Sequence, residues 1–91
     1  MAARFFENGY RIVIRVLFFG PVAECADARQ MQFDFQPGLC LQDVVTQLAA
    51  RFPKAFDIVC FIAVNNEQAR DMRLPLKDED EIAFMAKFSG G

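Results

Sequence analysis

The sequence predicts a single α+β domain in which a mixed β-sheet wraps over one main helix. Strand-like segments lie before and after one segment with a helical period, an order that packs the helix against the sheet. Of the 91 residues, 54% are hydrophobic and eleven are Phe, which is typical of a globular chain with a packed core. We therefore expect one domain with the order β-β-α-β-(β)-β and no internal repeat.

The first two strands are predicted to form a hairpin. Residues 11–19, RIVIRVLFF, combine β-branched and aromatic side chains, and residues 29–35, RQMQFDF, alternate strictly. Their core-facing side chains are expected to be Ile12, Ile14, Val16 and Phe18, and Met31, Phe33 and Phe35. The segment between them, GPVAECADA, carries turn residues and is predicted to be a loop.

The helix is predicted from residue 41 to residue 52. Its apolar face recurs every three or four residues and consists of Leu41, Val44, Val45, Leu48, Ala49 and Phe52. Asp43 in the first turn suits the positive end of the helix dipole, and Pro53 is expected to end the helix.

The strands after the helix complete the sheet. Residues 57–64, DIVCFIAV, predict a strand, followed by a turn at Asn65-Asn66 and a short return strand. LPLKDED is expected to be a turn region with at most one helical turn, and EIAFMAK the final strand. A ubiquitin-like β-grasp is the simplest topology with this order, because a ferredoxin-like fold needs a second helix.

Composition excludes several kinds of function. The net charge is −2 without a basic run, so nucleic acid is not expected as a partner. The chain has no histidine, which removes the commonest general base and metal ligand, and the acidic KDEDE lacks a calcium-loop pattern, so no metal site is expected. No stretch suits a signal peptide or a membrane span, and we expect a cytoplasmic protein.

The three cysteines, Cys25, Cys40 and Cys60, do not predict a disulfide framework or a zinc site, because they are odd in number and widely spaced. Cys60 lies inside an apolar strand and is expected to be a small core side chain rather than a nucleophile. Cys25 is expected in a loop, and Cys40 at the start of the helix, where a capping Ser or Thr would be favoured.

The chain resembles the MoaD/ThiS sulfur carrier family over residues 11–91, and within that family the small subunits of molybdopterin synthase. The resemblance rests on VLFFG followed by Glu24, the helix LQDVVTQLAARFP, the turn AVNNE, and the ending LPLKDEDEIAFMAKFSGG. It implies a β-grasp domain at residues 11–86 and an extended tail, 87–91. Residues 1–10, which precede the resemblance, are expected to be a flexible extension.

The resemblance also implies a chemistry. An E1-like activating enzyme uses ATP to adenylate the carboxylate of Gly91, and a persulfide donor then converts it to a thiocarboxylate. The large subunit of molybdopterin synthase accepts the tail and uses the sulfur for the molybdenum cofactor. The chain itself is then a carrier without a bound cofactor and not an enzyme. Gly90 and Gly91 fit this role because glycine has no Cβ to clash in a narrow channel.

A carrier must also dock on its partners. Strand alternation places Leu17, Phe19, Phe61, Ala63 and Met85 on the sheet face away from the helix, and such an apolar patch is unusual for a monomer. By resemblance, this face and the tail residues Lys87 and Phe88 contact the activating enzyme and the large subunit.

Alternatives remain open at this point. The sulfur could serve thiamine, cysteine or another metabolite, the chain could be a ubiquitin-like modifier joined to lysines, or it could be a plain interaction module. Three departures from the family pattern lie near the partner contacts: Ala23 where Arg is frequent, Glu79 where the acidic turn usually has Gly, and Ala86-Lys87-Phe88 where prolines and a small apolar residue are common.

Overall fold

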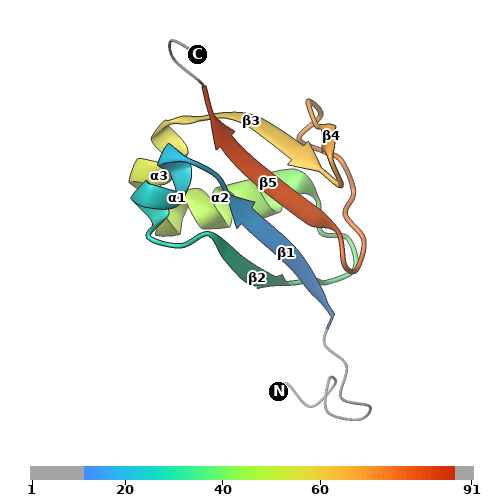
Figure 1. Ribbon diagram of the computed structural model, residues 1–91. Coiled ribbons are helices and arrows are strands. Elements are labelled where there is room, and N and C mark those ends of the chain that lie inside the picture. The colour runs from blue at the N-terminus through green and yellow to red at the C-terminus, as the bar shows by residue number, and fades with distance from the viewer. Residues whose placement is uncertain (1–11, 88–91) are drawn as a thin grey trace.

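The computed structural model describes residues 12–87, which form a five-stranded sheet with the order β2-β1-β5-β3-β4 and three helices (Figure 1). The strands are β1 (Val13–Phe18), β2 (Gln30–Asp34), β3 (Val59–Val64), β4 (Glu67–Gln68) and β5 (Glu81–Ala86). The helices are α1 (Pro21–Ala26), α2 (Leu41–Arg51) and α3 (Pro53–Asp57).

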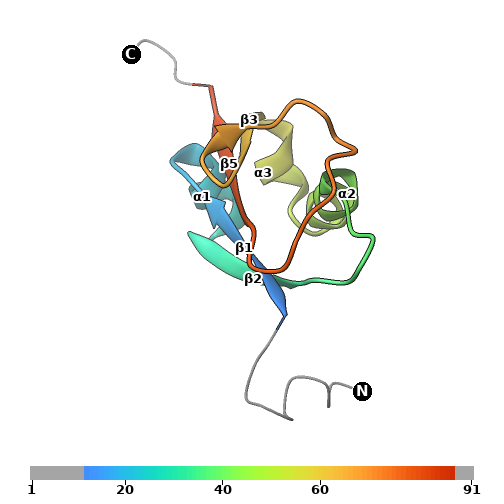
Figure 2. The same cartoon turned by 90° about the vertical axis from the view of Figure 1, so that its right-hand side faces the viewer.

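The first and last strands lie side by side in the centre of the sheet. β1 and β5 are parallel, with Leu17 opposite Ala83, whereas β2 pairs antiparallel with β1 and β3 pairs antiparallel with β5. The helix α2 lies across one face of this sheet (Figure 2). This arrangement is the predicted β-grasp fold.

The core lies between α2 and the inner face of the sheet. The side chains that are at most 2% exposed include Ile14 and Val16 of β1, Ile82 and Phe84 of β5, and Leu41, Val44 and Leu48 of α2. The Phe84 ring packs edge-on against Phe56, with 4.8 Å between centroids. Of the core-facing side chains predicted for the first strand, Ile14, Val16 and Phe18 are confirmed as buried, whereas Ile12 is only partly buried. The apolar face of the helix is confirmed at its buried positions, Leu41, Val44 and Leu48, and the rest of that face is partly buried.

The backbone N–H groups in the first turn of α2 have no acceptor within the helix, so other parts of the chain accept their hydrogen bonds. The backbone N–H of Cys40 donates to the carboxylate of Asp43 at 2.9 Å, and the N–H of Leu41 donates to the carbonyl of Leu74, also at 2.9 Å. The long connection between β4 and β5 thus closes over the beginning of the helix.

One prediction about the connections was wrong, and one was incomplete. GPVAECADA, predicted as a loop, contains α1, because Pro21 suits the first helical position and Asp27 ends the helix in the left-handed region at φ 58°. The main helix ends before Pro53 as predicted, but Pro53 also opens α3, which was not predicted, after Phe52 leaves the helical conformation with φ −127°. Proline can both end one helix and begin the next.

The prediction that Cys60 is a core side chain was also wrong. Val59 pairs with Ala86 and Phe61 pairs with Met85, so the register shifts between them and Cys60 is the extra residue of a β-bulge. Cys60 is exposed as a result, as is Cys25 on α1, whereas Cys40 is partly buried.

The predicted turn at Asn65-Asn66 is confirmed, with both residues in the left-handed region at φ 51° and 72°. The side-chain amide of Asn65 donates to the carboxylate of Asp80 at 2.8 Å, and its oxygen accepts the N–H of Glu81 at 3.0 Å. Asp80 is 6% exposed and also accepts the N–H of Lys77 at 2.7 Å. This network fixes the β3–β4 turn to the start of β5.

Candidate functional site

The five predicted docking residues lie together on the face of the sheet that α2 does not cover. We call this set, Leu17, Phe19, Phe61, Ala63 and Met85, the outer patch. Phe19 is 47% exposed and Phe61 is 42% exposed, and they are the exposed large hydrophobic side chains in the described part of the chain. Leu17, Ala63 and Met85 are partly exposed.

The register of the strands brings these residues into two adjacent rows. Leu17 of β1 and Ala63 of β3 both lie opposite Ala83 of β5, which makes the first row. Phe61 lies opposite Met85, and Phe19 follows β1 with its N–H bonded to the carbonyl of Phe84 at 3.1 Å. The outer patch therefore spans the three central strands and reaches the end of β5.

Sequence reasoning did not include Ala83 in the site. Ala83 lies at the centre of the first row, between Leu17 and Ala63, and is itself partly exposed. The alternation of side chains along β5 indicates that Ala83 belongs to the outer face, since it shares a strand face with Met85.

The opposite end of this sheet face is charged. Arg15 pairs with Glu81 across β1 and β5, and its guanidinium lies 3.6 Å from the Glu81 carboxylate. Both groups are accessible to water, so the pair adds at most about 1 kcal/mol to stability. The outer face thus changes from charged to apolar along β5, in the direction of the C-terminus.

A hollow of about 610 Å³ continues the outer patch toward α1. Leu17 and Phe19 form one side, and Ala23 and Glu24 of α1 contribute to the rest of the wall. Gly20 allows the chain to turn directly from β1 into α1, because its φ of 54° lies in the region that favours glycine. A partner side chain could therefore insert beside Phe19 without displacing the core.

The tail residues of the prediction lie at the limit of the structure. Lys87 is exposed and follows β5 directly, whereas Phe88, Gly90 and Gly91 lie outside the described residues. Across residues 12–87, no group of His, Cys, Asp and Glu could hold a metal ion. No helix in the same range is long and apolar enough to cross a membrane.

Comparison with known proteins shows the family of the chain. The model of the ThiS family matches residues 16–91. The chain belongs to the ThiS family of sulfur carriers. The matched range includes all of the outer patch and the last two glycines.

One curated relative and two solved structures are similar to this member of the ThiS family. The molybdopterin synthase sulfur carrier subunit of Chlamydomonas reinhardtii is 32% identical over 81 residues, which cover 86% of this chain and 98% of that protein. SAMP1 of Haloferax volcanii has a TM-score of 0.71 at 23% identity, covering 87% of this chain and 99% of that one. The complex of subunits 1 and 2 of the molybdopterin-converting factor from Helicobacter pylori contains a chain with a TM-score of 0.59 at 23% identity, covering 88% and 100%. At this level of identity, the similarity to the two solved structures shows a shared fold and nothing more.

Proposed function

We propose that this ThiS-family protein carries sulfur as a C-terminal thiocarboxylate on Gly91 for the synthesis of molybdopterin. The observation that carries the proposal is the outer patch, which reaches the end of β5 immediately before the tail. A partner that covers Phe61 and Met85 is thereby positioned to receive the residues that follow Lys87. The 32% identity to the Chlamydomonas carrier subunit supports molybdopterin as the product.

The proposed partners bind the outer patch in turn. The first is an E1-like enzyme that uses ATP, and the last is the large subunit of molybdopterin synthase. The Helicobacter complex of subunits 1 and 2 supports a carrier that works bound to a second subunit. Within the carrier, Lys87 and Phe88 extend the contact from the patch to the glycines.

The proposed chemistry needs no acid, base or metal from the carrier. The Gly91 carboxylate attacks the α-phosphate of ATP and releases pyrophosphate, which leaves an acyl-adenylate. A persulfide attacks the carbonyl through its terminal sulfur, releases AMP and forms an acyl disulfide. A thiol then attacks the donor's sulfur, so that a disulfide leaves with the donor and Gly91 keeps a thiocarboxylate.

The test is mass spectrometry of the protein after incubation with ATP, an E1-like enzyme and a persulfide donor. We expect an exchange of oxygen for sulfur that fragmentation locates on Gly91. A variant without Gly91 should not show it. Location is essential, because the oxidation of any of four methionines adds nearly the same mass. An unmodified Gly91 with several such enzymes would contradict the proposal.

A second experiment separates this function from that of a ubiquitin-like modifier. SAMP1, a small archaeal modifier protein, shares the fold, and a modifier would use the same activated glycine. Adding the thiocarboxylate form to the large synthase subunit and a pterin precursor should regenerate the free carboxylate as sulfur is transferred. Isopeptide bonds between Gly91 and lysines, in place of that transfer, would favour the modifier.

A further inference from the structure

The two rows of the outer face carry side chains of different size. The row nearer the charged end consists of Leu17, Ala83 and Ala63. The row nearer the C-terminus consists of Phe19, Met85 and Phe61. The first row thus holds both alanines, and the second holds both exposed phenylalanines.

The outward residues of β5 place opposite charges at the two ends of this pattern. Burial alternates along the strand, so the outward positions, in chain order, are Glu81, Ala83, Met85 and Lys87. Lys87 is exposed, and its ammonium group forms no ion pair with any residue from 12 to 87. The Glu81 carboxylate lies 3.6 Å from a guanidinium nitrogen of Arg15 and has lone pairs for a further donor.

This order of residues is complementary to itself. Consider a second copy that lies face to face with the first and whose β5 runs in the opposite direction, with a two-fold axis at the level of Phe84. Under this axis, Ala83 of one copy faces Met85 of the other, so a small side chain meets a large one. Glu81 faces Lys87, and the pair occurs twice because a two-fold interface uses the same surface of both copies.

The neighbouring strands match under the same axis. β1 of one copy lies over β1 of the other, and β3 lies over β3. Leu17 then faces Phe19, and Phe61 faces Ala63, so the residues of the outer patch and Ala83 all face one another. Aligned sheets pack about 10 Å apart with strand directions within about 30°. The long side chains of Glu81 and Lys87 can bridge that separation.

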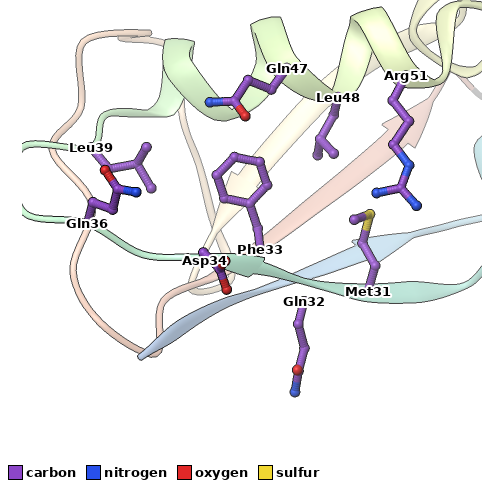
Figure 3. Close-up of a pocket in the computed structure, with 9 residues that line it drawn as sticks. All are labelled: Met31, Gln32, Phe33, Asp34, Gln36, Leu39, Gln47, Leu48 and Arg51. Carbon is purple, nitrogen blue, oxygen red and sulfur yellow. The ribbon is translucent and has the colours of Figure 1, made fainter. Parts of the chain in front are cut away.

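The apolar side chains of the edge strand β2 belong to the other face of the sheet. Figure 3 shows Met31 and Phe33 directed toward Leu48 of α2. The side chain of Arg51 extends from the same helix on this side (Figure 3). The self-complementary surface is therefore confined to the outer face, and Arg51 is a reference position away from it.

We infer that the free protein forms a symmetric homodimer through the outer patch, in which Glu81 of each copy pairs with Lys87 of the other. An apolar patch of this kind is unusual for a monomer, and a second copy covers it completely. The contact uses one face of three short strands, so we expect a weak and reversible dimer. The partners proposed above bind the same patch, so the dimer must dissociate before docking. That consequence rests on the proposed function, whereas the dimer itself does not.

The test is sedimentation velocity of the full chain at concentrations up to about 1 mM. A reducing agent keeps the exposed Cys25 and Cys60 from linking copies covalently. We expect the sedimentation coefficient to rise from the value of a monomer to that of a dimer and no further, because a two-fold interface is closed. A monomer at every concentration, or species that continue to grow, would overturn the inference.

Two charge reversals test the pairing. Glu81→Lys alone, or Lys87→Glu alone, places like charges opposite each other twice in the dimer, so each should raise the Kd of the dimer roughly tenfold or more. An equimolar mixture of the two variants should dimerise again, because both pairs in the mixed dimer then have opposite charges. A loss of folding could not produce this recovery. Arg51→Glu reverses a charge on the other side of the sheet and is the matched control, which should leave the Kd unchanged.

The remaining outcomes also decide the inference. A mixture no more dimeric than either variant alone, or equal weakening by Arg51→Glu, would contradict the pairing of Glu81 with Lys87. In spectra of the ¹⁵N-labelled chain, amides that shift with concentration should centre on Phe61 and Met85. Shifts centred on Met31 would assign the contact to the other side of the sheet. A chain without Gly91 should dimerise as the full chain does, so this inference and the proposed function can fail separately.

Discussion

At the scale of single residues, the fold determines which thiols can react. Cys60 is exposed because the bulge in β3 adds one residue between Val59 and Phe61. Cys25 is exposed on α1, whereas Cys40 is partly buried at the start of α2, where its N–H is bonded to Asp43. Accessibility is one of the two conditions for thiol reactivity, so the three cysteines should not behave alike.

We predict that a bulky maleimide labels Cys25 and Cys60 in the native protein well before it labels Cys40. Peptide mass spectrometry at successive times gives the order. Cys60→Ser should change the free energy of unfolding by less than about 0.5 kcal/mol, as at other exposed positions. Protection of Cys60 until the protein unfolds would contradict the bulge.

At the scale of elements, the β3–β4 turn is held mainly by one side chain. Asn65 and Asn66 both adopt positive φ, but Asn65 alone bonds to Asp80 and Glu81. A type I′ turn favours Asn followed by Gly, which are the residues that accept such angles at low cost. The two asparagines therefore contribute to stability for different reasons.

Replacing each asparagine with glycine separates these reasons. Asn65→Gly should lower the free energy of unfolding by about 1–3 kcal/mol, because the buried carboxylate of Asp80 loses a donor. Asn66→Gly keeps the network and relieves the positive φ, so it should leave stability equal or raise it by up to about 1 kcal/mol. Denaturant titration of both variants measures the difference, and equal losses would refute this account.

The long periodic elements were the ones that sequence could predict. β1, β5 and α2 each repeat their pattern over enough residues to distinguish the period of a strand from that of a helix. The helices α1 and α3, with six and five residues, are too short to display a period, and each begins with a proline that also reads as a turn signal. The bulge at Cys60 depends on the pairing of β3 with β5, which no local pattern contains.

The candidate site was predictable for the same reason. Strand alternation placed Leu17, Phe61 and Met85 on one face before the register was known. The hollow beside Phe19 was not predictable, because it requires α1 to fold where a loop was expected.

At the scale of the whole molecule, the outer patch and the core lie on opposite faces of the sheet. The outer patch belongs to the central strands, and the core lies between the sheet and α2. A change to the patch should leave the core intact. The proposed docking of an activating enzyme can therefore be tested without disturbing the core.

We predict that Phe61→Asp impairs docking on an E1-like activating enzyme. Phe61 is 42% exposed, so the fold should tolerate the change, whereas a charge in the middle of an apolar interface should raise the apparent KM by roughly tenfold or more. Pyrophosphate release at varied carrier concentration measures this. Gln42→Glu adds the same charge at an exposed position of α2, away from the outer patch, and is the matched control. Equal kinetics for the two variants would exclude the outer patch as the docking surface.

The parallel pairing of β1 with β5 has a mechanical consequence. The described chain enters the sheet at the start of β1 and leaves it at the end of β5, so its two ends lie at opposite ends of one hydrogen-bonded pair (Figure 1). A pull between them loads all of the bonds of that pair in shear at once, rather than opening them one after another. When a partner pulls on the end of the chain, the force therefore acts along the direction in which the sheet resists most. The carrier can then be separated from that partner without being unfolded.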